Sequence, residues 1–220
     1  MPFDIRFKTS FNCIVCGPSG SGKTTWVRNL LQLKEHLFTN VPARTFLFYS
    51  MPQMIYTDMK AEGLINEMFN VNDAFPTLET VQALVHQYKS QGSIVIFDDM
   101  VTTLTPDFER IFLNLSHHEN ASVILLSQNM FYNDKIYRNL SLNSHYFVLM
   151  KNGRDHQQVS ILAKQICPTN SRYILDAYAD ATRYPFSYLI LDFRSESSPT
   201  IKLRSHIFPH ECPVRVYLEK

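Results

Sequence analysis

An eight-residue segment near the N-terminus constrains the fold of this chain more than any other part of its sequence. It reads Gly17-Pro18-Ser19-Gly20-Ser21-Gly22-Lys23-Thr24 and is followed by Thr25, and it matches the Walker A pattern at every fixed position. Glycines let the backbone curl until its N–H groups point inward at phosphate oxygens, and the N-terminal end of a following helix adds positive charge. An apolar run at 11–16 precedes the segment and a helical pattern follows from residue 23. The sequence therefore predicts a phosphate-binding loop between a buried strand and a helix.

The loop predicts an ATP site with a Mg²⁺ ion. We expect the backbone of residues 17–25 to hold the triphosphate and Lys23 to bridge the β- and γ-phosphates. The Thr24 hydroxyl is expected to ligate Mg²⁺, because this ion prefers hard oxygen ligands.

A second apolar run, residues 93–97, ends in two carboxylates, Asp98 and Asp99. This arrangement is typical of the Walker B position, where Asp98 would hold Mg²⁺ through water. Asp99 would then orient or deprotonate the water that attacks the γ-phosphate. Glutamate is commoner at the second position, so a role for Asp99 in capping the next loop stays open.

Polar residues further along the chain complete the predicted catalytic group. Gln128 follows the apolar run 121–127, where additional-strand ATPases carry a sensor for the γ-phosphate and the attacking water; an ordinary polar residue at a strand end is the alternative. Hydrolysis leaves negative charge on phosphate oxygens, which an arginine can stabilise. Arg138 and Arg154 are the candidates for this role, and each alone is more often a solvated surface charge.

The order of apolar and amphipathic segments predicts the fold class. Strands buried on both faces and separated by helices indicate a parallel sheet covered on both sides. We therefore predict an α/β P-loop NTPase of the additional-strand type, with a mostly parallel central sheet. One domain is expected over 1–220, with its core at about 10–193 and a C-terminal strand and tail at 194–220. The expected strands are 11–16, 45–50, 93–97, 121–127, 145–150 and 188–192; the expected helices are 23–34, 77–89 (with Thr77 as N-cap), 106–118, 155–166 and 170–181.

Composition and charge limit the classes of partner and the cellular compartment that this protein can have. The chain has 220 residues, 45% of them hydrophobic, and a formal net charge of +1, so it has no global basic field of the kind that coats DNA. No apolar run approaches the ~18–20 residues that span a bilayer, and no secretory h-region opens the chain. We expect an intracellular protein without a membrane partner.

Three local patterns suggest other chemistry and are explained more simply by structure. Cys13 and Cys16 have the spacing of half a zinc or redox site, but both fall on the strand before the phosphate loop and no second pair follows. The sequence 152–155 has the Asn-x-x-Asp spacing of guanine readers, but it lacks their lysine. The run 117–119, His-His-Glu, fits a solvated helix end better than a metal site, because adjacent helical residues point about 100° apart.

With these motifs described, the chain resembles the genome-packaging ATPases of the FtsK–HerA superfamily, especially the poxvirus-type and Polinton- or adintovirus-type enzymes. The resemblance spans residues 11 to about 208. It depends on the stretches at 16–25, 96–99, 127–129 and 137–146, and continues into 151–155 and 162–166. The part from Arg138 to Arg154 discriminates most, because many unrelated NTPases share the Walker motifs.

The resemblance implies a homo-hexameric ring that threads double-stranded DNA into a preformed viral capsid at a portal vertex. It also implies ATP at subunit interfaces, an arginine supplied by the neighbouring subunit, and an aspartate pair at the Walker B position. Such an enzyme would work in the host cell, in the cytoplasm or nucleus where virions assemble. Two alternatives stay open at this point: a small P-loop nucleoside or nucleotide kinase, and a nucleotide-gated binding protein without turnover.

Overall fold

A nine-stranded sheet runs through the protein in the computed structural model, which describes residues 4–100, 105–129, 135–153, 156–211 and 213–219. The strands are β1 (Asn12–Cys16), β2 (Arg44–Tyr49), β3 (Glu67–Asn70), β4 (Ser93–Asp98), β5 (Ala121–Ser127), β6 (Tyr146–Met150), β7 (Tyr188–Asp192), β8 (Leu203–Ser205) and β9 (Arg215–Tyr217). The helices are α1 (Lys23–Gln32), α2 (Lys34–Leu37), α3 (Met54–Ala61), α4 (Leu78–His86), α5 (Pro106–His118), α6 (Lys135–Leu142), α7 (His156–Ile166), α8 (Ser171–Ala181) and the 3-10 turns η2 (Pro199–Ile201) and η3 (Pro209–Glu211).

The spatial order of the strands is β3-β2-β4-β5-β1-β6-β7-β8-β9. The first six in this order pair in parallel, and β7, β8 and β9 add an antiparallel part. All residues of β1, β4, β5 and β6 are buried, because helices cover both faces and parallel strands then need apolar side chains throughout. The predicted α/β class with a mostly parallel sheet is confirmed, and β5 is the additional strand between β1 and β4.

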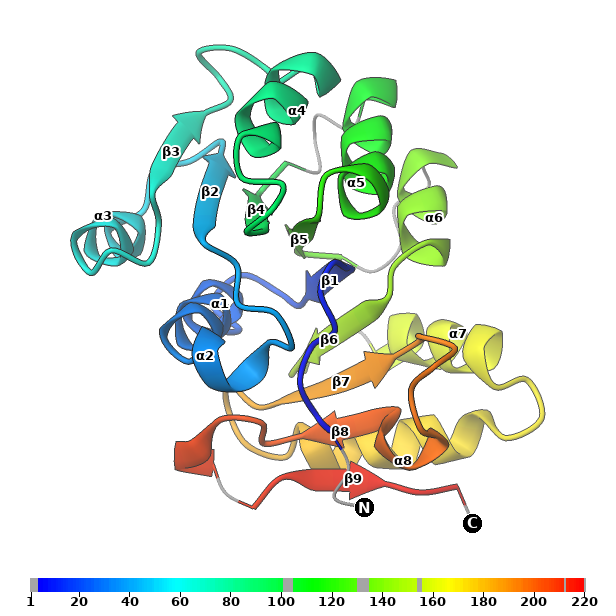
Figure 1. The fold of residues 1–220 in the computed structure, drawn as a ribbon. Helices are drawn as coiled ribbons and strands as arrows, with labels where there is room; N and C mark the ends of the chain where they lie inside the picture. Colours follow the sequence, from blue (N-terminus) through cyan, green and yellow to red (C-terminus); the bar gives the residue numbers. More distant parts are fainter. Residues whose placement is uncertain (1–3, 101–104, 130–134, 154–155, 212, 220) are drawn as a thin grey trace.

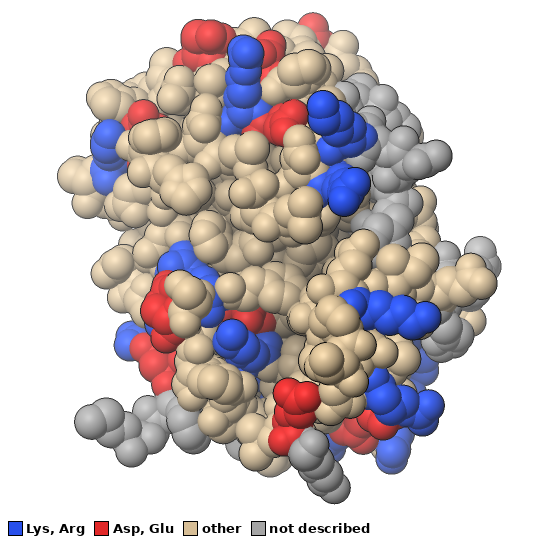
Figure 2. Space-filling view, turned by 90° about the vertical axis from the view of Figure 1, so that its right-hand side faces the viewer, with Lys and Arg blue, Asp and Glu red and all other residues tan. Residues whose placement is uncertain are grey.

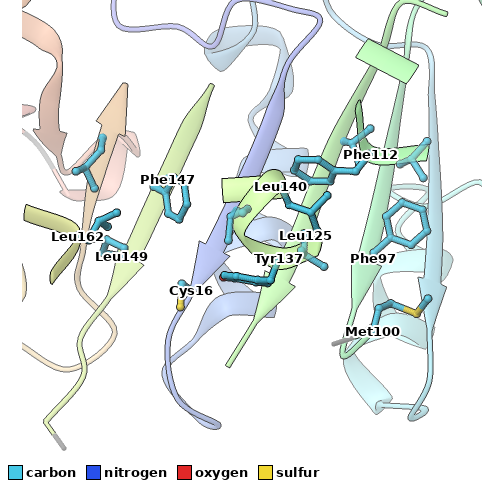
Figure 3. Packing of buried hydrophobic residues seen from close by; sticks show 14 of the residues in the cluster. Cys16, Phe97, Met100, Phe112, Leu125, Tyr137, Leu140, Phe147, Leu149 and Leu162 are labelled. Carbon is cyan, nitrogen blue, oxygen red and sulfur yellow. The ribbon is translucent and has the colours of Figure 1, made fainter. Parts of the chain in front are cut away.

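Two layers of helices cover the two faces of the sheet, as Figure 1 shows. Helices α1, α2 and α3 pack on one face together with Phe7 and Phe11 of the N-terminal segment. Helices α4 to α8 pack on the other face. Figure 3 shows part of this second layer, where Tyr137 and Leu140 of α6 lie over Leu125 of β5. Burial of these apolar side chains is the main driving force for the fold.

Threonine caps fix where α4 and α5 begin. The Thr77 hydroxyl accepts the Thr80 N–H at 3.3 Å, and the Thr80 hydroxyl accepts the Thr77 N–H at 3.0 Å. The predicted N-cap at Thr77 is thus confirmed as a reciprocal capping box. Thr105 accepts the Phe108 N–H at 3.2 Å and caps α5 in the same way.

Three regions of the fold did not follow from the sequence pattern. The region 51–76 had no assignment, and it contains α3, where only Tyr56 and Met59 are buried, and the edge strand β3, where no residue is fully buried. Helix α6 has eight residues and was not predicted. The tail after residue 194, expected as one strand and irregular chain, forms the two short strands β8 and β9. The strands, with three or four residues each, are too short for a periodic pattern to stand out.

Candidate functional site

The phosphate loop leaves β1 at its carboxyl end and enters α1. The Gly17 N–H donates to the Ser127 carbonyl at 3.1 Å, which ties the start of the loop to β5. A β-carbon on Gly17 would lie 2.6 Å from Cβ of Met150 and 2.7 Å from Oγ of Ser21, so a larger residue does not fit. Gly22 has a φ of 96°, in the left-handed region that favours glycine. The glycines of the predicted loop therefore have two functions: Gly17 allows the close approach of Met150 and Ser21, and Gly22 allows the backbone to turn.

Lys23 lies folded against its own loop. Its Nζ donates to the carbonyls of Gly17 at 2.6 Å and Pro18 at 3.1 Å, and the side chain is nearly buried. Burial lowers the pKa of Lys23, and the neighbouring Asp98 carboxylate partly offsets that effect. The ammonium group is thus held beside the loop by acceptors that a phosphate oxygen can replace.

Asp98 is the last residue of β4, opposite the loop, and accepts hydrogen bonds from two hydroxyl groups. Its Oδ2 accepts from the Tyr56 hydroxyl at 2.6 Å and from the Thr24 hydroxyl at 3.2 Å. Burial raises the pKa of Asp98, while the hydrogen bonds from Tyr56 and Thr24 and the charge of Lys23 act in the opposite direction. Thr24 and Asp98 thus bring two hard oxygen donors together, as a Mg²⁺ site requires.

Asp99 has a strained backbone and two polar contacts. Its φ is 60°, which is uncommon for a residue other than glycine and is found often at functional sites. The Gln128 amide donates to its Oδ1 at 3.2 Å, and the Ser50 hydroxyl donates to its carbonyl at 3.0 Å. The predicted sensor Gln128 and the predicted base Asp99 are therefore in direct contact, because β5 lies beside β4.

These groups line one cavity of about 350 Å³. Its walls combine the second half of the phosphate loop, the two aspartates and the glutamine with residues from other segments: Ser19, Gly20, Gly22, Lys23, Thr24, Thr25, Gln53, Ile55, Asp98, Asp99, Leu126, Gln128 and Phe186. The cavity thus brings together the predicted metal and catalytic residues, apart from the two arginines, with most of the predicted phosphate loop; Gly17, Pro18 and Ser21 do not line it. The cavity can hold a polyphosphate with a divalent cation and a water molecule beside it.

The two arginine candidates are not part of this cavity. Arg138 is exposed on α6 and does not line it. Arg154 lies outside the described residues. The role of either arginine stays a prediction.

Sequence reasoning missed three residues of the site. Tyr56 bonds to Asp98, and Gln53 donates to the Tyr56 hydroxyl at 2.8 Å. Phe186 lies at the edge of the cavity and precedes β7. No motif marks these positions, because α3 and the segment before β7 reach the site only through the tertiary fold.

The two decoy patterns that the structure describes have structural explanations. Cys13 and Cys16 point to opposite faces of β1, and burial raises the pKa of both thiols. Oε2 of Glu119 lies 2.8 Å from Nδ1 of His86 on α4, so this carboxylate joins two helices. Within the described ranges, no group of three His, Cys, Asp or Glu side chains could hold a metal ion.

None of the helices formed by the described residues is both long and apolar enough to cross a bilayer.

Comparisons with known proteins identify a family and several solved structures with a similar fold. A family described as "Poxvirus A32 protein" matches residues 4–177. No curated protein sequence matches this chain. The fold is similar to that of the genome packaging NTPase B204 from Sulfolobus turreted icosahedral virus 2 in complex with sulfate, with a TM-score of 0.60 and 12% sequence identity over 97% of this chain and 98% of that one. It is also similar to B204, the DNA-packaging ATPase from Sulfolobus turreted icosahedral virus, with a TM-score of 0.56 and 12% identity over 100% of both chains.

A third similar structure is the cytoplasmic domain of the type VII secretion ATPase EccC from Thermomonospora curvata. Its TM-score is 0.55 and its identity 14%, over 94% of this chain and 25% of that one. Identities this low show a shared fold alone. The P-loop fold predicted from the sequence is confirmed by these structures and by the strand order.

Proposed function

This chain belongs to the poxvirus A32 protein family, and from that premise we propose that it is an ATPase that translocates double-stranded DNA into a viral capsid. The family match confirms the resemblance to poxvirus-type enzymes that the motifs indicated. Solved structures of B204, described as a genome packaging NTPase, in complex with ATP-gammaS and AMPPCP support ATP as the substrate.

The observation that carries the proposal is the contact between Gln128 and Asp99 beside the phosphate loop. A site that only binds nucleotide needs the loop and its lysine. A hydrolytic site also needs groups that place a water molecule in line with the γ-phosphate and take up its proton. Asp99 is our proposed base, and Gln128 is our proposed water-positioning group.

The other residues bind and neutralise the nucleotide. Loop N–H groups and Lys23 hold the β- and γ-phosphates. Thr24 and Asp98 would hold Mg²⁺, which neutralises charge on the phosphate oxygens when bound. Either Arg138 or Arg154 would reach the site of a neighbouring subunit and stabilise the charge that develops in the transition state.

Our proposal extends to partners. Self-association into a homo-hexameric ring would place weak DNA contacts around a central channel, and the ring would dock on the capsid or portal vertex in the infected host cell. Figure 2 shows Lys and Arg interspersed with Asp and Glu on the face turned to the viewer, and the net charge is +1. Such a surface suits a motor that holds phosphates weakly and without sequence preference.

Phosphate release from ATP, with and without linear double-stranded DNA, tests this function. We expect DNA to raise kcat in the natural protein. Asp99→Asn should lower kcat by roughly 10²–10⁴-fold, as the loss of a general base does, while nucleotide still binds. Asp73→Asn, which changes an exposed aspartate, is the matched control, and Lys23→Ala gives the background.

Turnover that DNA does not change, or that Asp99→Asn leaves intact, would contradict the proposal. Phosphate transfer that depends on an added nucleoside would instead favour a kinase.

A further inference from the structure

Strand β3 forms one end of the sheet and has one open side. It is the last strand in the spatial order, as Figure 1 shows, and no strand of the described residues other than β2 pairs with it. The backbone N–H and C=O groups on the outer side of such a strand form a template for a further strand. The edge of β3 can therefore accept an extended chain.

A row of stacked phenylalanine rings runs toward this edge. Phe97 of β4 stacks on Phe48 of β2 with ring centroids 5.1 Å apart, and Phe48 stacks on Phe69 of β3 with centroids 4.8 Å apart. These distances are close to the ~4.7–4.9 Å between neighbouring strands, and the three residues are paired in register. Phe97 and Phe48 are buried, whereas Phe69, at the end of the row, is half-buried. A strand added to β3 would bring its own side chain onto the ring of Phe69.

A cavity of about 460 Å³ lies on the same face of β3. Phe48 and Phe69 line it from the sheet, Phe75 and Pro76 line it from the segment after β3, and Leu84 lines it from α4. Pockets that hold a small ligand measure about 300–1,000 Å³. The cavity therefore has room for an aromatic side chain that continues the row of rings.

Two carboxylates border this apolar cavity. Asp73 lines it, and Glu67 lies on the same face of β3 as Phe69, because side chains two positions apart on a strand point to one face. Both acidic residues are exposed, and neither forms an ion pair with another residue of the described ranges. The ammonium group of Lys60 donates to the carbonyl of Asn66 just before β3. A ligand with positive charge beside its aromatic group is complementary to these carboxylates.

We propose that the outer edge of β3 binds an extended segment of another protein, which adds a strand to the sheet. The segment carries an aromatic side chain that stacks on Phe69 and enters the cavity, with Lys or Arg two positions away on each side. Backbone hydrogen bonds hold the added strand, and the cavity and the two carboxylates select its sequence. The residues that line this cavity are all different from those that line the cavity beside the phosphate loop, so partner binding and ATP hydrolysis can be tested separately.

Binding of a synthetic peptide with blocked ends and the sequence TKTFTKT tests the proposal. Its Phe and both Lys residues share one face when the peptide is extended, and fluorescence anisotropy of a labelled peptide measures its affinity for the full chain. Replacement of the peptide's Phe by Ala should weaken binding by roughly 10–150-fold, the range for burial of one large apolar side chain. Amide hydrogen exchange at residues 67–70 should slow when the peptide binds, because the added strand takes up N–H groups of the outer edge.

Charge reversal tests the role of the carboxylates. Glu67→Lys should weaken binding of TKTFTKT by roughly 2–30-fold, which corresponds to twice the free energy of an exposed ion pair. The same variant should bind the charge-reversed peptide TETFTET more tightly than the natural protein does. Glu35→Lys is the matched control, since Glu35 is exposed on α2, which packs on the other face of the sheet.

Three results would overturn the added strand: no binding of TKTFTKT at millimolar concentration, an affinity that does not depend on its Phe, or unchanged hydrogen exchange at residues 67–70. Equal effects of Glu67→Lys and Glu35→Lys would overturn the selection by charge. Self-association of the natural protein that excess TKTFTKT reverses would identify a second copy of this chain as the occupant and would overturn the partner protein. A protein that binds the peptide but does not hydrolyse ATP would contradict the proposed function and leave the β3 site standing.

Discussion

Tyr56→Phe removes one hydroxyl from the site and leaves its surroundings in place. The hydroxyl donates to Oδ2 of Asp98 at 2.6 Å, and the ring is 2% exposed. A distance this short is typical of a hydrogen bond to a carboxylate. The substitution therefore leaves Asp98 with Thr24 as its remaining hydroxyl donor, and Tyr56 acts as a positioning residue.

The expected loss follows from the type of bond. A hydrogen bond to a charged group contributes about 1.5–3 kcal/mol, which corresponds to roughly a 10–150-fold change in an equilibrium or rate constant. The bond also favours the ionised carboxylate and lowers the pKa of Asp98. Its removal should raise that pKa, so that protons compete with Mg²⁺ at higher pH. The acidic limb of the pH profile of kcat/KM should therefore move to higher pH.

Steady-state hydrolysis over a range of pH and Mg²⁺ concentration measures both effects. Tyr49→Phe is the matched control, because its ring centroid lies 5.3 Å from that of Tyr56 and the hydroxyl donors to Asp98 are Tyr56 and Thr24. Thermal unfolding without nucleotide reports on folding. An acidic limb and a Mg²⁺ requirement that stay unchanged, or that shift equally in Tyr49→Phe, would refute the reasoning.

Two further predictions concern stability and pH. Burial raises the folded-state pKa of Asp98, so the ionised carboxylate lowers the stability of the folded protein at pH values above that pKa. Asp98→Asn should therefore raise the Tm of the nucleotide-free protein at neutral pH. This gain in Tm should vanish at low pH, where the natural carboxylate is protonated. An Asn variant that melts lower at pH 7 would contradict this. Burial lowers the pKa of His145 from 6.5 to about 4, and its Nδ1 accepts a backbone N–H of β1 at 2.9 Å. As the pH falls, the histidine of the unfolded chain binds a proton before that of the folded protein, so the stability of the fold should decrease between about pH 6.5 and about pH 4. The urea midpoints measured at pH 7 and pH 5 should therefore differ less in His145→Gln than in the natural protein. An equal difference in the two proteins would count against this role.

The sequence predicted most about the parts of the site that follow strand ends. Asp98, Asp99 and Gln128 each come after a buried run, and parallel strands bring their carboxyl ends to one edge of the sheet. Chain order alone thus placed these three groups opposite the phosphate loop. The same reasoning could not find Tyr56, whose contact with Asp98 joins residues 42 positions apart and depends on how α3 lies against β2 and β4.

The fold was hardest to predict where elements are short. Strands β8 and β9 have three residues each, and β3 has four half-buried or exposed residues at the sheet edge. Hydrophobic periodicity needs several turns or repeats to be visible. Phe186 gave no signal either, because a single aromatic residue after Pro185 is an ordinary loop sequence, and its position beside Gly22 comes from the pairing of β7 with β6.

The strand order places the elements of the candidate site on both sides of the phosphate loop. Strand β1 carries the phosphate loop, β5 and β4 lie on one side of it with the hydrolytic groups, and β6 and β7 lie on the other side. Ligands of open α/β sheets bind where the connections diverge in this way, because the loops leave a crevice there. The cavity is therefore lined from both sides of β1: by Asp99 and Gln128, which follow β4 and β5, and by Phe186, which precedes β7.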